Sequence, residues 1–162
     1  MTRFYRQLYQ SPLGPLSIVV DEESLVGVWF CDQANCEQGL EHIEEACQPL
    51  HGAVFEWLDQ YFLGENPSMP FPLSPQGTDF QQRVWAYLAQ IPYGESQTYG
   101  EIARALSCGS AQAIGQAVGR NPLILLIPCH RVLGTEKKLT GYAAGLDRKR
   151  WLLQHEAISW KE

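Results

Sequence analysis

The chain has 162 residues, of which 45% are hydrophobic and 11% aromatic, and its formal net charge is −6. This length suits one domain or two small ones, with enough apolar residues for a buried core. No apolar stretch approaches the ~20 residues that span a bilayer. The opening "MTRFYRQLYQSPLG" also lacks the apolar block of a signal peptide. We therefore expect a soluble, cytoplasmic protein and no membrane partner.

Residues 3–30 predict three short strands. Apolar alternation is present in "RFYRQLYQ", "LSIVVD" and "SLVGVWF", with turns at "SPLGP" and "DEES". Two helices are predicted to follow, one near residues 36–47 and one over "AVFEWLDQYFLG" at 53–64. His42 and His51 flank Cys47 at spacings that match no common metal site, so we expect both histidines at the surface.

A proline-rich stretch separates this half from the next. "GENPSMPFPLSPQG", residues 64–77, holds four prolines, and such a stretch cannot lie inside a helix or a sheet. The sequence therefore predicts an N-terminal α+β domain over residues 1–66, a linker over 67–77 and a second domain over 78–162.

The second half predicts helices. "DFQQRVWAYLAQI" at 79–91 has apolar residues at helical spacing, and in "TYGEIARAL" Thr98 precedes Glu101 by three residues, as in a capping box. Ser110 is a suitable N-cap for "AQAIGQAVGRN". Two short helices joined by the turn "SCGS" predict a helix-turn-helix.

The second helix of this pair is rich in alanine and glycine. Each glycine costs ~1 kcal/mol relative to alanine in a helix, so a close neighbour must offset that loss. Another protein backbone or a DNA backbone would serve equally well.

The charge distribution indicates that the second half, and not the first, binds a polyanion. Residues 1–77 sum to 2 − 11 = −9 and residues 78–162 to 10 − 7 = +3.

Five cysteines are present, and no two of them have the C-x-x-C spacing of zinc or redox motifs. Four are expected to be free thiols packed as small hydrophobes, namely Cys31, Cys36, Cys47 and Cys108. Cys129 differs, because "LLIPCHRVLG" places it after Leu123–Ile127, a predicted buried strand or extended segment. Its neighbour His130 can take the thiol proton, directly or through water, and a carboxylate could orient that imidazole.

Several motifs around this pair resemble a known family. "IPCHRV", preceded by "NP" and followed by "GYAAGLDRKRWLLQHE", resembles the active-site signature of O6-alkylguanine-DNA alkyltransferases. The likeness extends through "FQQRVW", "IPYGESQTYGEIA" and "AIGQAVGRNP", and "SPLGPL" resembles the first hairpin of that family. The resemblance implies an α+β protein with a ribonuclease-H-like N-terminal domain and a helical, winged-helix-like second domain.

The resemblance also implies an activity and its residues. Members move an alkyl group from O6 of guanine in DNA onto their own cysteine once, without a cofactor, and O4-methylthymine is a second candidate substrate. Here Cys129 would be the acceptor and His130, through a water, the base that Glu156 orients. Asn121 would brace the turn of Cys129. Tyr99 would donate a proton or hydrogen bond to the leaving guanine.

The binding residues follow from the same resemblance. The backbone around Cys129, Val132 and Ala143 would read a flipped guanine, with Tyr142 and Ala144 beside it. The helix after Ser110 would enter the minor groove of double-stranded DNA. The expected DNA contacts are Ala111, Gln112, Gly115, Gln116, Arg120 and Arg131. We expect a monomer.

Three positions depart from the family pattern. Gln112 stands where an arginine usually fills the gap left by the flipped base, and glutamine lacks the cation and the planar fork. Ala143 and Ala144 replace the first two residues of an "SGG" stretch, and Ala144 is expected to narrow the pocket by one methyl group. Thr2 and Asp21 do not supply the zinc ligands of some relatives, so we expect no metal.

Two other functions remain open at this point. One is a lesion-binding protein without transfer activity, which Gln112 alone favours and the retained Cys129 opposes. The other is a cysteine hydrolase that uses Cys129, His130 and Glu156, for which a helix-turn-helix has no evident use.

Overall fold

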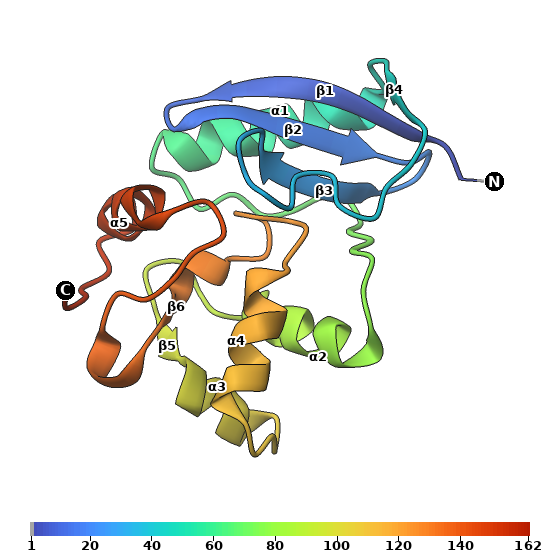
Figure 1. Cartoon of the computed structure of the whole chain (residues 1–162). Helices are drawn as coiled ribbons and strands as arrows, with labels where there is room; N and C mark the ends of the chain where they lie inside the picture. Colours follow the sequence, from blue (N-terminus) through green and yellow to red (C-terminus); the bar gives the residue numbers. More distant parts are fainter. Residues whose placement is uncertain (1) are drawn as a thin grey trace. The chain divides into compact units, whose positions relative to one another are not determined.

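The computed structural model describes residues 2–162, which fall into two compact units. The first ends at Gln76 and the second spans Gly77–Glu162. The first holds most of the sheet and the second most of the helices (Figure 1), so the α+β class is confirmed. In residues 2–162, no helix has the length and apolar character needed to cross a membrane.

The first unit is built on a four-stranded sheet in the order β3-β2-β1-β4. The strands are β1 (Phe4–Ser11), β2 (Gly14–Val20), β3 (Leu25–Phe30) and β4 (Ile43–Glu45). The first three run antiparallel to one another and β4 runs parallel to β1. All three predicted strands are confirmed. β1 and β2 form a tight hairpin in which Gly14 has a φ of 117°, a conformation that favours glycine.

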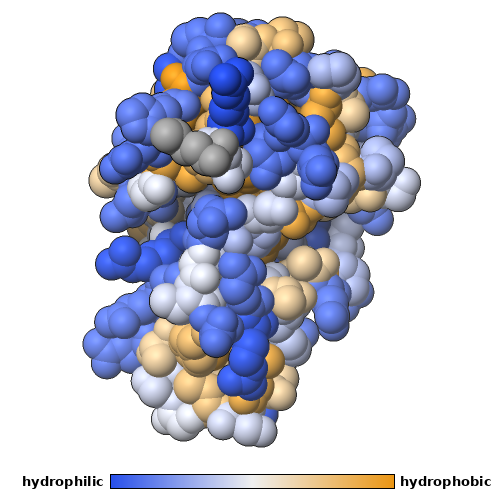
Figure 2. All heavy atoms as spheres, turned by 90° about the vertical axis from the view of Figure 1, so that its right-hand side faces the viewer, coloured by the Kyte–Doolittle hydropathy of each residue, from blue (hydrophilic) through white to orange (hydrophobic). Residues whose placement is uncertain are grey.

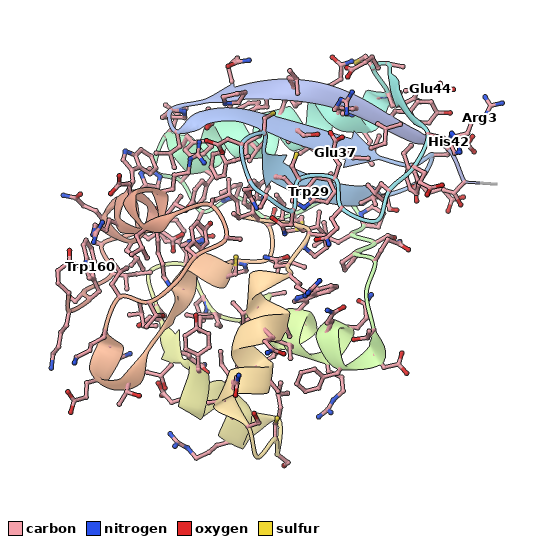
Figure 3. The ribbon with its side chains drawn as sticks, viewed as in Figure 1. Arg3, Trp29, Glu37, His42, Glu44 and Trp160 are labelled. Atoms are coloured by element: carbon pink, nitrogen blue, oxygen red, sulfur yellow. The ribbon has the colours of Figure 1, made fainter. Side chains whose placement is uncertain are left out.

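The helix predicted near residues 36–47 is wrong. The chain turns there and then forms β4, and Glu37 and His42 have left-handed φ values of 59° and 58°. A long-range contact holds this segment: Arg6 donates to both carboxylate oxygens of Glu37 at 2.7 Å, and Ser17 Oγ donates to Glu37 at 2.7 Å. Figure 3 shows Glu37 lying over the ribbon of the sheet. Ion pairing to β1 therefore overrides local helix propensity.

The helix predicted at 53–64 is confirmed but begins earlier, as α1 (Pro49–Phe62). His51 caps its first turn: the ring Nδ1 accepts from the Gln48 backbone N–H at 3.0 Å, and Nε2 donates to the Ile18 carbonyl at 3.1 Å. The side chain is buried, with 1% exposure, so the expected surface position of His51 is wrong. His42 is exposed, as expected.

The proline-rich segment makes backbone hydrogen bonds with β3. Leu25 N donates to Pro72 O at 2.9 Å, Ser74 N donates to Leu25 O at 2.8 Å, and Phe71 is buried. Part of the stretch expected to be a linker therefore pairs along the sheet edge of the first unit.

The second unit contains the predicted helix-turn-helix. Its elements are α2 (Asp79–Leu88), β5 (Gln97–Thr98), α3 (Tyr99–Ala105), α4 (Ala111–Gly119), β6 (Val132–Leu133) and α5 (Leu146–His155). Thr98 and Glu101 form the predicted capping box of α3, and Ser110 Oγ caps α4 by accepting from Ala113 N at 3.0 Å. Short polar caps thus fix where both helices begin.

The small residues of α4 serve two purposes. On one side Trp85 Nε1 of α2 donates to the Ala117 carbonyl at 2.8 Å, which requires a close approach of the two helices. On the other side a Cβ built on Gly119 would meet nothing within 4 Å. Hydrophobic residues gather toward the lower end of the face shown in Figure 2, at the level where Figure 1 draws α2, α3 and α4. Helix packing therefore explains part of this composition and leaves a bare outer face.

His51 provides a test of the first unit through pH. Burial lowers the pKa of His51 from 6.5, so the unfolded chain takes up its proton first as the pH falls. The contribution of His51 to the free energy of unfolding is therefore complete above pH 6.5 and declines below it. The decline is at most about 1.4 kcal/mol per pH unit.

Urea unfolding at pH 7.5 and 5.5 would measure this effect. We expect His51→Gln to lose about 1–2 kcal/mol at pH 7.5, as for a lost helix cap, and to show a weaker pH dependence than wild type. His42→Gln, at an exposed histidine, is the matched control. An unchanged pH dependence in His51→Gln would contradict this assignment.

Candidate active site

Cys129 begins a 3-10 turn, Cys129–Arg131, directly after Pro128. Its side chain is buried, with 4% exposure. The preceding residues Leu123–Ile127 are buried, as predicted, but form a tight loop rather than a strand. Ile127 N donates to Leu123 O at 2.8 Å, and Leu125 has a left-handed φ of 74°. This loop delivers the thiol into the interior of the second unit.

Asn121 braces the loop from inside. Its Nδ2 donates to the Ile127 carbonyl at 2.8 Å, and its Oδ1 accepts from Leu123 N at 2.9 Å. Cys129 N donates to the same Ile127 carbonyl at 2.8 Å. A single buried amide thus fixes both ends of the loop, which fits the bracing role expected of Asn121.

A pocket of about 230 Å³ opens onto the thiol. It brings together residues from α3, α4, the Cys129 turn and the loop before α5. Its lining residues are Tyr99, Gly115, Val118, Gly119, Cys129, Gly141, Tyr142 and Ala143. Of the residues expected at the substrate, Cys129, Tyr99, Tyr142 and Ala143 therefore meet in one cavity, and Gly115 joins them from the helix expected at the DNA.

Val132 and Ala144 lie outside that lining. Val132 is fully buried behind the turn, and its carbonyl accepts from Lys149 Nζ at 2.6 Å. The expected contact of the Val132 backbone with a substrate therefore stays a prediction. Ala144 is not among the residues that line the pocket, so the expectation that its methyl group narrows the cavity has no support here and stays a prediction.

His130 and Glu156 form the predicted pair. His130 Nε2 lies 2.6 Å from Glu156 Oε2, and both side chains are fully buried. Glu156 stands at the end of α5, where Leu133, Leu153 and Ile158 form a small core against which Trp160 packs (Figure 3). That core fixes the position of the carboxylate.

The hydrogen bonds define the protonation state of the imidazole. Arg131 and the Gly94 backbone N–H also donate to Glu156, which favours the carboxylate and makes His130 Nε2 the donor. Burial lowers the pKa of His130, although Glu156 opposes the shift. The ring is therefore neutral at pH 7. Its Nδ1 is a free base with no hydrogen-bond partner in residues 2–162.

Arg131 has a different place from the one expected. Its Nε donates to Glu156 Oε1 at 2.8 Å, and its Nη1 donates to the Ile91 carbonyl at 2.6 Å. Its guanidinium lies over the Tyr93 ring. Arg131 is 8% exposed. This buried position gives no support to the expected contact of Arg131 with DNA, which stays a prediction. The residues next to Arg131 in the sequence do not indicate that it binds Glu156, which lies 25 residues further along the chain.

The surroundings of the thiol act on its pKa in opposite directions. Burial raises the pKa of Cys129, while hydrogen bonds from Asn121 and Tyr142 and the positive charge of Lys149 lower it. Burial is the largest of these effects, so the resting thiol is protonated. A base is therefore needed before the sulfur can act as a nucleophile.

Tyr99 faces the thiol across the pocket. Its hydroxyl accepts from Thr140 Oγ1 at 3.4 Å, and burial raises its pKa. A Cβ on Gly115 would lie 3.7 Å from the Tyr99 ring, in ordinary contact. The phenol therefore keeps its proton at neutral pH and can donate it into the pocket.

The remaining expected DNA residues lie on the outside of α4. Ala111, Gln112, Gln116 and Arg120 are exposed. Gly115 and Gly119, one helical turn apart, line the pocket from the same helix. In residues 2–162, no group of three or more His, Cys, Asp or Glu side chains is arranged to hold a metal ion.

Sequence reasoning missed four residues of this site. Val118 and Gly119 lie three and four positions after Gly115, so helical periodicity would have placed them beside it. Lys149 lies three and four positions before Leu152 and Leu153, on the buried face of α5. Gly141 carries no side-chain signal, because it contributes only backbone to the pocket.

Comparisons with known proteins cover both units. Residues 4–75 match the 6-O-methylguanine DNA methyltransferase ribonuclease-like domain, and residues 79–158 match the DNA-binding domain of the same family. The methylated-DNA–protein-cysteine methyltransferase of Methanosarcina acetivorans is 42% identical over 158 residues, 94% of this chain and 97% of that protein. The one from Haemophilus influenzae is 41% identical, over 99% of this chain and 90% of the other.

A solved structure agrees with these matches. The crystal structure of Mycobacterium tuberculosis OGT in complex with DNA has a TM-score of 0.84 and 39% identity. The alignment covers 95% of this chain and 92% of that one. The predicted fold, a ribonuclease-like domain followed by a DNA-binding helical domain, is confirmed.

The buried position of Arg131 leads to a prediction. Arg131→Lys cannot hold Glu156 with two parallel bonds, so we expect slower reaction of Cys129, by at least about 10-fold, with DNA affinity unchanged. Arg120→Gln, at an exposed position on the same unit, should do the reverse.

Alkyl transfer and binding to unmodified duplex DNA would be measured separately. Circular dichroism would check folding, since breaking a buried ion pair costs about 3–5 kcal/mol. Weakened DNA binding by folded Arg131→Lys, with normal reactivity, would return Arg131 to the DNA surface.

Proposed function

Because this chain belongs to the 6-O-methylguanine DNA methyltransferase family, we propose that it repairs O6-alkylguanine in DNA by moving the alkyl group onto Cys129. The observation that carries this proposal is the position of the thiol. Cys129 lines a base-sized pocket beside an imidazole that has one nitrogen fixed by Glu156 and the other free.

The step balances without a cofactor. The thiol proton passes through a water to His130 Nδ1, and the sulfur attacks the alkyl carbon. A C–S bond forms as the C–O6 bond breaks, and the leaving guanine takes a proton from Tyr99. The phenol recovers a proton from the imidazolium. The thiol thus loses one proton overall and guanine gains one, while the thioether remains on the protein.

The network around Glu156 supports the first proton transfer. Arg131 and the Gly94 N–H hold the carboxylate in place, and the carboxylate stabilises the imidazolium that forms on His130. The new C–S bond keeps the sulfur of Cys129 from acting as a nucleophile again, and we therefore infer that each chain reacts once. O4-methylthymine has the same O-methyl chemistry and is a second, slower substrate.

Access to the lesion requires a flipped base. O6 of a paired guanine is enclosed by the duplex, so the nucleotide must leave the stack to reach a buried thiol. The outer face of α4, with Ala111, Gln112 and Gln116 exposed and Arg120 at its end, supplies the surface that would lie in the minor groove. α4 borders both that surface and the pocket, through Gly115 and Gly119. The protein acts as a monomer in the cytoplasm.

Cys129 gives the direct test of transfer. Incubation with duplex DNA that contains O6-methylguanine should add one methyl group per chain and then stop, and peptide mass mapping should place it on Cys129. Cys129→Ala should bind the DNA and gain no mass. Repeated turnover, or methylation of Cys31 or Cys108 instead, would refute the proposal.

Gln112 tests the flipping step. Flipping costs a few kcal/mol, and a planar cation fills the vacated stack better than an amide does. Gln112→Arg should therefore speed transfer from duplex DNA by about 10-fold, which corresponds to about 1.4 kcal/mol. Transfer from free O6-benzylguanine should not change, since nothing has to be flipped.

Stopped reactions with both substrates would measure these rates, and Gln116→Arg, at an exposed position on the same helix, is the matched control. If Gln112→Arg altered both substrates equally, residue 112 would not be the group that fills the stack.

A further inference from the structure

The hydroxyl of Tyr99 gives up a proton in the proposed reaction, and its burial opposes that step. Tyr99 lines the pocket, and burial raises the pKa of its phenol above the usual 10.0, as does the charge of Cys129. A phenol that loses its proton in a dry pocket becomes an anion, and a buried anion needs a hydrogen-bond donor. The group that contacts the Tyr99 oxygen therefore bears on the reaction.

Thr140 is the residue that meets this oxygen. Its Oγ1 donates to the Tyr99 hydroxyl oxygen at 3.4 Å, and this hydrogen bond lowers the pKa of Tyr99 against the larger effect of burial. No other group in residues 2–162 forms a hydrogen bond with that hydroxyl. The phenol therefore keeps its own proton for an acceptor in the pocket. The distance is long, as such hydrogen bonds often are before a substrate binds and they shorten.

Close packing fixes the side chain of Thr140. A Cβ built on Gly134 would lie 2.5 Å from Thr140 Cγ2 and 3.8 Å from its Cβ. Gly134 has a φ of −79°, a value that any residue adopts. Its lack of a side chain therefore makes room for the Thr140 methyl group rather than for an unusual backbone. A β-branched side chain is stiff at χ1, so the seated methyl group holds the hydroxyl toward Tyr99.

The backbone that carries Thr140 is also fixed. Leu139 N donates to Lys161 O at 2.6 Å, and the Leu139 side chain packs against the small core that positions Glu156. Thr140 itself is not among the residues that line the pocket. It therefore reaches the pocket only through Tyr99, from a rigid segment.

We propose that Thr140 is a positioning residue for the proton donor: its hydroxyl directs the Tyr99 O–H into the pocket and stabilises the phenolate that forms as guanine leaves. The Tyr99 proton moves to guanine as the C–O6 bond breaks, while Thr140 keeps its own proton and contributes only a hydrogen bond. This inference rests on the proposed transfer to Cys129, but it concerns the donor rather than the nucleophile.

Three threonine variants separate the hydroxyl of Thr140 from its shape. Thr140→Val replaces the hydroxyl with a methyl group, Thr140→Ser keeps the hydroxyl, and Thr135→Val, at an exposed threonine, is the matched control. Transfer from O6-benzylguanine at pH 7.5 would be followed over a range of concentrations, which gives the maximal rate and the half-saturating concentration separately. Each variant would be made both in wild type and in Tyr99→Phe.

Thr140→Val should lower the maximal rate about 10-fold at an unchanged half-saturating concentration, and Thr140→Ser should stay within about 3-fold of wild type. Thr135→Val should match wild type. Tyr99→Phe alone should be about 100-fold slower, and adding Thr140→Val to it should have no further effect. An equal loss in both backgrounds would overturn the proposal, because Thr140 would then act on the protein in general. A wild-type rate in Thr140→Val would overturn it as well.

Ionisation of Tyr99 can be followed without any substrate. In protein labelled with 3-fluorotyrosine, the Tyr99 fluorine signal would be assigned by its loss in Tyr99→Phe and titrated by NMR. Thr140→Val and Thr140→Ala, of which the second adds no atom, should move the midpoint upward by about 1 pH unit. Thr140→Ser should leave it near the wild-type value, and equal midpoints in all four proteins would refute the role of Thr140. Failure of the proposed function would appear separately, as wild-type protein that titrates as expected but is not alkylated at Cys129.

Discussion

The chemistry of the second unit depends on one buried carboxylate. Glu156 receives hydrogen bonds from His130, Arg131 and the Gly94 backbone N–H. These donors come from the turn of the nucleophile and from the loop after α2, while Glu156 itself ends α5. A fixed, ionised carboxylate sets the tautomer of the imidazole and so determines which nitrogen is free to act as a base. Without it, the loop that carries Cys129 would have no oriented proton acceptor.

Burial imposes opposite demands on this site, and the structure meets them with separate groups. A dry pocket favours displacement at carbon and excludes water as a competing acceptor of the alkyl group. The same dryness opposes ionisation of the thiol. Asn121, Tyr142 and Lys149 offset that effect from three directions, two through hydrogen bonds and one through charge. The thiol is therefore buried, but the groups around it still favour a negative charge on its sulfur.

Local signals in the sequence were enough for much of the fold. Strand alternation, the Thr98–Glu101 capping box and the Ser110 cap concern neighbours in the chain, and the structure has them where they were predicted. Predictions failed where a distant partner decides. Arg6 binds Glu37 where a helix was predicted, and the Ile18 carbonyl binds His51, which was expected at the surface. The bond between Arg131 and Glu156 is likewise a distant contact that the sequence did not indicate. The Cys129–His130 pair could be singled out from its place after a buried segment, whereas Glu156 was identified only through resemblance, since composition and periodicity do not bring it to the pair.

The depth of Cys129 has a consequence for the lifetime of the protein in its working form. A thiol that reacts only once can no longer accept an alkyl group if another electrophile or an oxidant modifies it first. Cys129 is buried and protonated at rest, whereas Cys31 and Cys47 are exposed. Small reactive molecules in solution therefore meet the outer thiols before the inner one. Burial thus protects the Cys129 thiol from modification until a substrate enters its pocket.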